Sequence, residues 1–118
     1  FKELNGIGST AENLKAAAAG EHEEWTSMYP EFAKVAREEG FTRIANLFEM
    51  VAKIEQEHDA RYNLLLANIQ EDKVFKRNEK MIWMCSNCGH VYEGTEAPEI
   101  CPVCAHPKAF FEIKANNY

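Results

Sequence analysis

The sequence predicts a mainly α chain that ends in a small metal-bound β module, on three observations. Before residue 70 the chain is rich in Ala, Glu, Leu and Lys, whereas all four cysteines and three of the four prolines come later. Apolar residues in the first part recur with the 3.6-residue period of a helix face. The cysteines have the spacing of metal ligands. We therefore predict two domains, residues 1–72 and 73–118.

The second domain contains two Cys-x-x-Cys pairs with twelve residues between them, formed by Cys85, Cys88, Cys101 and Cys104. Two such pairs flanked by turn residues predict a tetrahedral site for one metal ion. A module of about 40 residues buries too little apolar surface to fold without a stabilising cross-link such as a bound metal ion, which agrees with this interpretation. A disulfide framework is the alternative, and four cysteines allow three pairings.

Charge and hydropathy exclude several classes of protein. The net charge of -6 gives no general attraction for nucleic-acid phosphates. No apolar run reaches the roughly 18 residues that a membrane span needs. No signal peptide is visible, and paired thiols suit a reducing compartment, so we expect a cytoplasmic protein. The chain begins at Phe1, without an initiator methionine, so we expect a processed product, an internal fragment or one half of something larger.

Two long helices are expected in the first domain. Ser9 and Glu12 form a capping-box pattern ahead of a helix over residues 10–39, and Gly40 suits its C-terminal cap. Pro30 lacks a backbone donor, which predicts a kink or bulge between Thr26 and Pro30.

The second helix is expected over residues 42–69, with Thr42 as its cap. The connection at Gly40 and Phe41 is so short that the two helices must be antiparallel neighbours.

Ionisable residues interrupt the apolar stripe of each helix near its middle. Glu21 and Glu24 lie on the first stripe, and Glu55 and His58 lie on the second as Glu-x-x-His. Buried carboxylates without partners are very costly, and a bound cation would resolve that cost. Carboxylate and imidazole ligands suit iron or manganese, although affinity alone does not exclude zinc. Tyr29 lies near the same face, where its hydroxyl could bond a ligand carboxylate or simply pack in the core.

A solvated helix face is the alternative interpretation, because an isolated Glu-x-x-His is common. We assign His22, Glu23 and Glu57 to such solvated groups and Trp25 to packing. In the cysteine module, we expect His90 and His106 at the surface. We expect aromatic side chains to pack around the metal, namely Trp83, Tyr92, Phe110 and Phe111.

Three segments resemble the second half of rubrerythrin: GEHEEWTSMYPEFAKVAREEGF, IEQEHDARY and CSNCGHVYEGTEAPEICPVCAHPKAFFE. Together they cover nearly the whole chain. The resemblance implies an antiparallel helix pair of a ferritin-like four-helix bundle, followed by a rubredoxin-like domain. It also implies a non-haem di-iron peroxidase that reduces hydrogen peroxide to water in defence against oxidative stress.

The resemblance implies a role for each candidate residue. Glu21 and His58 match ligands of one iron each, and Glu55 matches a carboxylate that bridges two irons. Glu24 matches the carboxylate that changes its iron contacts with oxidation state. Tyr29 matches a tyrosine bonded to the ligand set. The four thiolates match the ligands of a rubredoxin-type iron: Cys85, Cys88, Cys101 and Cys104.

The chain departs from the family pattern because it supplies two bundle helices where the family has four. A second polypeptide could supply the other pair, a second copy of this chain could do so, or the carboxylate site could be absent. We favour a second polypeptide, and expect a homo-oligomer or domain-swapped assembly and an electron-donor protein as further partners.

The expected cofactors are two iron ions at the carboxylate site and one at the cysteine site. Zinc could replace iron in the cysteines. A four-thiolate iron beside a redox-active site makes sense as an electron relay, which favours iron. Two other functions stay open: a zinc-ribbon-like structural or protein-interaction module, and a ferritin-like ferroxidase that handles iron.

Overall fold

The computed structural model describes all residues, Phe1–Tyr118, as two compact units. The first unit comprises Phe1–Gln70 and is helical, and the second comprises Glu71–Tyr118 and contains a small sheet. Each unit has its own architecture and is described separately.

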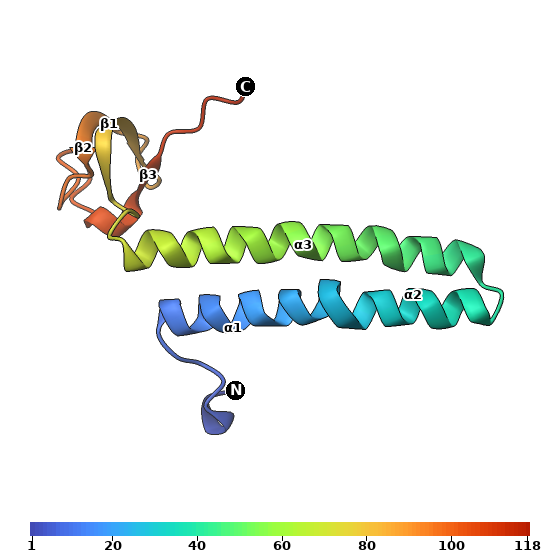
Figure 1. Cartoon of the computed structure of the whole chain (residues 1–118). Helices are drawn as coiled ribbons and strands as arrows, with labels where there is room; N and C mark the ends of the chain where they lie inside the picture. Colours follow the sequence, from blue (N-terminus) through green and yellow to red (C-terminus); the bar gives the residue numbers. More distant parts are fainter. The chain divides into compact units, whose positions relative to one another are not determined.

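The first unit is an antiparallel helix pair (Figure 1). One arm contains helix α1, Thr10–Glu23, a π-helical segment, Glu24–Met28, and helix α2, Tyr29–Glu38; the other arm is helix α3, Thr42–Gln70. A short 3-10 turn, Lys2–Leu4, precedes them. The predicted capping box is present, since the Ser9 N–H donates to a Glu12 carboxylate oxygen at 2.7 Å. None of the helices has the length and apolar content required to cross a bilayer.

The π segment, Glu24–Met28, is the predicted interruption of the first helix. The N–H of Tyr29 donates to the carbonyl of Glu24, five residues back, where an α-helix would bond four residues back. Pro30 has no N–H to contribute to the ladder and lies at the start of α2, where its ring is tolerated. The interruption therefore begins two residues before the expected region at Thr26 to Pro30 and overlaps it from Thr26 to Met28.

The first arm ends in a left-handed turn at Gly40, whose φ is 85°. The Gly40 N–H donates to the Arg37 carbonyl at 3.1 Å, and the Phe41 N–H donates to the Ala36 carbonyl at 2.8 Å. These two hydrogen bonds form a Schellman cap. Thr42 is the first residue of α3 rather than its cap, because the first helical bond runs from the Ala45 N–H to the Phe41 carbonyl, at 2.9 Å.

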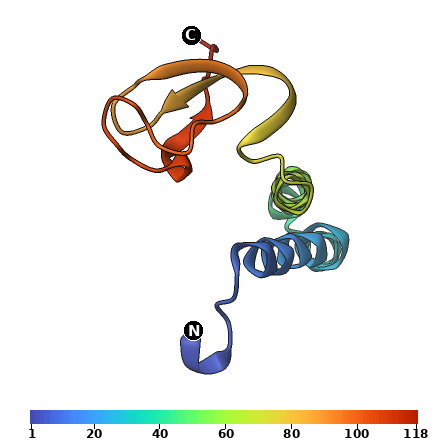
Figure 2. The same ribbon diagram turned by 90° about the vertical axis from the view of Figure 1, so that its left-hand side faces the viewer.

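Small residues form the line along which the two arms meet. Figure 2 looks along the helices and shows the arms as a pair with no further helix over them. The buried apolar residues are all alanines: Ala18, Ala33, Ala36 and Ala45. Large apolar side chains are left exposed, including Phe32 and Val35, which are 45% and 40% accessible. The helix pair therefore has an apolar face that no further helix of its own unit covers.

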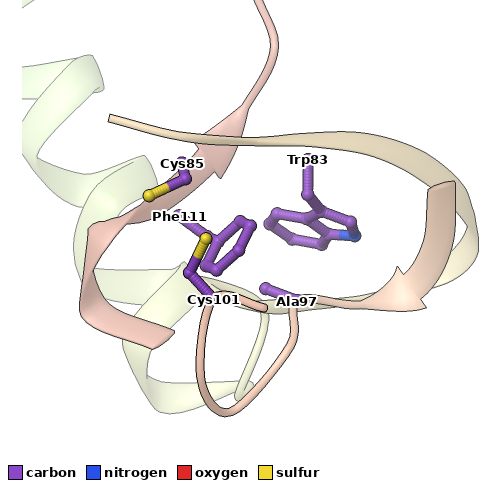
Figure 3. Close-up of a cluster of buried hydrophobic side chains, with 5 residues drawn as sticks. All are labelled: Trp83, Cys85, Ala97, Cys101 and Phe111. Carbon is purple, nitrogen blue, oxygen red and sulfur yellow. The ribbon is translucent and has the colours of Figure 1, made fainter. Parts of the chain in front are cut away.

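The second unit is a three-stranded antiparallel sheet in the order β2-β1-β3. Its strands are β1, Lys76–Cys85, β2, Val91–Glu96, and β3, Phe111–Ile113, with a 3-10 turn, Lys108–Phe110, before β3. Trp83 is fully buried and its indole N–H donates to the Gly94 carbonyl at 2.9 Å. Trp83, Ala97 and Phe111 form a small core beside the cysteines Cys85 and Cys101 (Figure 3).

Candidate metal centres

The four cysteine sulfurs lie together in the second unit, with no disulfide between them. Their Sγ atoms all lie within 4.8 Å of one another, and the Cys85–Cys104 and Cys88–Cys101 pairs are each 3.7 Å apart. A tetrahedral ion with metal–sulfur bonds of about 2.3 Å separates its sulfurs by about 3.75 Å. The arrangement therefore fits one four-coordinate ion and does not fit a disulfide framework, whose sulfurs bond at about 2.0 Å.

Two equivalent backbone turns deliver these thiols. In the first, the Cys85 N–H donates to the His90 carbonyl and the Gly89 N–H donates to the Cys85 carbonyl. The second turn repeats this pattern from Cys101 to His106, with Ala105 in the place of Gly89. Both central residues are left-handed, with φ of 79° at Gly89 and 60° at Ala105. The two halves of the site are thus built by the same local geometry.

The thiols differ in acidity because their surroundings differ. A hydrogen bond from the His106 backbone lowers the pKa of Cys104 to about 6. The His90 backbone also lowers the pKa of Cys88, but burial and the neighbouring thiols outweigh it and raise that pKa to about 12. Crowded thiols therefore release a first proton readily and hold the last one strongly. A metal ion must displace these protons, so its binding is expected to weaken as pH falls.

A second candidate centre lies on the helix pair. Glu21 of α1 meets Glu55 and His58 of α3, and one donor atom from each lies within 4.8 Å of the others. The His58 Nδ1 atom is 2.7 Å from a Glu55 carboxylate oxygen and 3.5 Å from one of Glu21. Three of the four ionisable residues that interrupt the apolar stripes therefore lie together in the structure. Two carboxylates and an imidazole form a donor set that suits iron.

Burial and the repulsion between the Glu21 and Glu55 carboxylates make this cluster favourable for a bound cation. Burial raises the pKa of Glu21, and a hydrogen bond and the charge of Glu55 raise it further. Glu21 and Glu55 side chains retain 19% and 14% accessibility, so solvent cannot fully screen them. A bound cation would offset the charge of the two carboxylates and relieve this repulsion.

Glu24 and Tyr29 lie beside the cluster without joining it. Burial raises the pKa of Tyr29, and the charges of Glu24, Glu55 and Glu21 act in the same direction. The Tyr29 ring packs on Phe32 and Phe48, with centroids 6.1 and 6.0 Å away. Glu24 is half-buried at the start of the π segment. Its role as a ligand, and that of Tyr29 as a bonded hydroxyl, stay predictions.

The sequence interpretation missed Asp59, which is 8% accessible and accepts hydrogen bonds from Trp25 of the first arm and Asn63 of α3. His22 and Trp25, expected as a solvated group and a packing residue, both bond to this carboxylate. Asp59 follows His58 directly in the sequence. Its position on the line where the two helices meet was the signal from which its burial could have been predicted.

The surroundings of the cysteine site also differ in part from expectation. Trp83 and Phe111 are buried as expected, but Tyr92 and Phe110 are 42% and 37% accessible. His106 is half-buried, and its ring packs edge-on against Phe110 with centroids 4.5 Å apart.

Both units match known family models. Residues 3–66 match the model described as rubrerythrin. Residues 83–112 match the model of the rubrerythrin rubredoxin-like domain. The four cysteines and the carboxylate cluster all fall within these matched regions.

Curated relatives agree with these matches. The chain is 56% identical over 112 residues to a rubrerythrin of Porphyromonas gingivalis and 51% identical over 122 residues to rubrerythrin-1 of Clostridium acetobutylicum. These alignments cover 95% and 98% of this chain but only 56% and 63% of the relatives. A solved structure of partially reduced nigerythrin superposes with a TM-score of 0.53 at 30% identity, over 92% of this chain and 51% of that one.

Proposed function

Because the chain belongs to the rubrerythrin family, we propose that it forms part of a non-haem iron peroxidase that reduces hydrogen peroxide to water. The observation that carries the proposal is the presence of two dissimilar donor sets in one chain. One is a carboxylate–imidazole cluster suited to iron, and the other is a set of four thiols spaced for a tetrahedral ion.

The reaction consumes two electrons and two protons for each peroxide, and yields two waters. Iron at the helix cluster would supply the two-electron reduction of the O–O bond, and iron at the thiols would pass electrons singly. Glu21, Glu55 and His58 would hold the first ions, with Glu24 as a further carboxylate able to approach. The Tyr29 hydroxyl, whose pKa is raised, would keep its proton and act as a hydrogen-bond donor.

The four thiols would hold the relay ion in the sheet unit: Cys85, Cys88, Cys101 and Cys104. Backbone donors from His90 and His106 reduce the negative charge on two of these sulfurs. Such bonds favour the reduced, more negative state of an iron site and so tune its potential.

The exposed apolar face supports the proposal that further helices complete the bundle. An apolar groove of about 760 Å³ runs between the arms and is lined by Phe32, Val35, Phe41, Ile44 and Phe48, among others. We propose that a second polypeptide segment or a second copy covers it and adds carboxylate and imidazole ligands.

Metal analysis together with visible absorption provides the first test. Ferric tetrathiolate absorbs strongly in the visible, whereas a zinc form is colourless. Iron in excess of one ion for each chain would indicate occupancy of the carboxylate cluster as well. A preparation that holds only zinc at the cysteines, and no iron after anaerobic loading, would contradict the proposal.

Cys101→Ser provides the functional test. We expect the variant to complete a single peroxide turnover after chemical reduction but to lose steady turnover with an external electron donor. Ser86→Ala, which changes an exposed hydroxyl in the same unit, serves as the matched control. Steady turnover that survives Cys101→Ser would exclude the thiolate relay.

A further inference from the structure

Asp59 is the one charged side chain that the structure buries, at 8% accessibility. A buried carboxylate is stable only when donors surround it. Its Oδ2 atom accepts from the Trp25 indole N–H at 2.9 Å and lies 3.0 Å from the His22 Nδ1 atom. Its Oδ1 atom accepts from the Asn63 amide at 2.6 Å. Since an ionised carboxylate only accepts, His22 must donate through Nδ1–H.

These bonds join the two arms of the helix pair. His22 and Trp25 belong to the first arm, whereas Asp59 and Asn63 belong to α3. The bonds from His22 and Trp25 therefore cross between the arms, and the bond from Asn63 stays within one helix. The His22 and Trp25 rings also pack edge to face, with centroids 5.3 Å apart. We call Asp59, His22 and Trp25 the carboxylate clamp.

The carboxylate clamp lies next to the candidate metal ligands in sequence but turns away from them. His22 follows Glu21, Trp25 follows Glu24, and Asp59 follows His58. Successive helical residues point about 100° apart. The clamp accordingly borders a separate crevice of about 360 Å³ lined by Lys15, Ala18, Ala19, His22, Asp59 and Asn63. No member of the metal-ligand cluster lines that crevice.

The clamp also fixes the entry into the π segment. Trp25 is the second residue of that segment, and the Thr26 hydroxyl donates to the His22 carbonyl at 2.5 Å. The π segment has a looser hydrogen-bond ladder than an α-helix and so needs support from outside itself. Asp59 supplies that support from the opposite arm, one residue from His58.

We propose that Asp59 is a positioning residue that fixes the turn from Glu21 to Trp25, so that Glu21 and Glu24 face Glu55 and His58. It does so through Trp25 and His22, without contact to the bound metal. The inference rests on the proposed function only in treating those four side chains as metal ligands. The arm-to-arm bonding itself is independent of it.

Amide hydrogen exchange of the full chain, with zinc at the cysteines and no other metal, tests the clamp directly. Asp59→Leu fills the space without accepting a bond, so we expect exchange across Glu24–Met28 to rise by about tenfold or more. Asn63→Ala is the matched control, because it removes two bonds to Asp59, both within α3, but no bond between the arms. Exchange in that segment should stay near the wild-type rate in the control.

Asp59→Asn keeps the size and one acceptor oxygen, so we expect it to restore much of the protection. Unchanged exchange in Asp59→Leu would overturn the inference. A uniform rise over all helical amides would overturn it too, because that pattern reports general stability rather than a local clamp.

Ferrous iron alone, added anaerobically to the same zinc-filled chain, gives the second readout. Loss of a supporting partner behind metal ligands commonly weakens binding by about 10–100-fold. We expect that loss in Asp59→Leu, partial recovery in Asp59→Asn and none of it in Asn63→Ala. Equal affinities in all variants would overturn the positioning role. If the wild-type chain binds no ferrous iron at the cluster, the proposed function fails, and hydrogen exchange still decides the clamp.

Discussion

At the scale of single residues, the cysteine site depends on two left-handed positions that differ in side chain. Gly89 has φ of 79° and Ala105 has φ of 60° in otherwise equivalent turns. Glycine adopts this conformation without a steric penalty, whereas a Cβ atom meets the neighbouring carbonyl oxygen. The second turn therefore carries backbone strain that the first turn avoids.

Separate substitutions of these two residues should change the free energy of unfolding in opposite directions. Gly89→Ala should lower the free energy of unfolding by about 1 kcal/mol, since its added Cβ meets no atom within 4 Å outside the two neighbouring residues and only the backbone strain counts. Ala105→Gly should raise it by about 0.5 kcal/mol, because relief of strain exceeds the added freedom of the unfolded chain. Guanidinium unfolding of the metal-loaded chain, followed by the absorption of the thiolate site, measures both. The same sign for both substitutions would contradict the strain argument.

A second residue-scale feature is the ion-paired link of Lys108 to Glu96 and Glu99, which ties the second cysteine turn to β2. The hydrogen bond from Lys108 lowers the pKa of Glu96, and Glu96 and Glu99 raise the pKa of Lys108. The lowered pKa contributes stability above the unfolded value near 4.5, which is lost as pH falls through the folded value. The raised pKa contributes stability below about 10.5, which is lost as pH rises through the folded value.

Lys108→Met should therefore release metal faster than the wild type between about pH 5 and pH 10, and the difference should disappear as pH falls through the folded pKa of Glu96, which lies below 4.5. Transfer of zinc to a chelator dye, measured across this range, tests the expectation. Lys80→Met is the control, because Lys80 makes only a long 3.9 Å contact with Glu93 at the surface. A difference that persists unchanged at acidic pH would contradict the role of the Glu96 pair.

At the scale of elements, the π segment sets the orientation of the first arm. One extra residue in a helical turn rotates everything before it by about 100° relative to everything after it. Glu21 lies before the segment, and Tyr29 lies after it. Both residues reach the same region because the extra residue in the π segment provides this rotation.

Deletion of Ser27 should convert the π segment to regular α-helix. Either the Glu21 turn or the Tyr29–Phe48 contact must then rotate away from α3. We expect helix content to stay the same by circular dichroism, while ferrous-iron affinity at the carboxylate cluster falls by about tenfold or more. Ser27→Ala, which keeps the chain length, should bind as the wild type does. Unaltered affinity after the deletion would show that the π segment has no part in placing the cluster.

Local chemistry made much of this architecture predictable from sequence. Pro30 acts through its missing backbone N–H, and the Ser9 and Glu12 side chains accept from backbone N–H groups three residues away, so the interruption and the cap could be predicted. The position of the π segment could not, because tertiary contacts of Trp25 and Tyr29 decide which turn absorbs the extra residue. The burial and bonding of Asp59 could not be predicted for the same reason, because its donors Trp25 and His22 lie 34 and 37 residues away in sequence. The thiolate site was predictable because its ligands are close in sequence.

At the scale of the whole molecule, apolar surface is distributed unevenly over the helix pair. The contact between the arms uses alanines, whereas larger side chains remain accessible, including Phe41 at 58% and Leu47 at 48%. Contiguous apolar patches of more than a few hundred Å² mark interaction surfaces. Alanines in the contact between the arms and large apolar side chains on the exposed face are thus what is expected of half a helical bundle, not of a domain with a complete polar surface.

The exposed face should drive self-association when no other helices are supplied. We expect the chain to form dimers or larger species as its concentration rises, because burial of this face removes apolar area from water at about 25 cal/mol for each Å². Ile44→Lys places a charge in the apolar groove and should shift the chain toward monomer in analytical ultracentrifugation. Lys53→Glu, in the charged groove lined by Pro30, Arg37 and Glu49, is the matched control and should associate as the wild type does. A chain that stays monomeric at high concentration, or an Ile44→Lys variant that associates equally well, would show that this face is not the one that drives assembly.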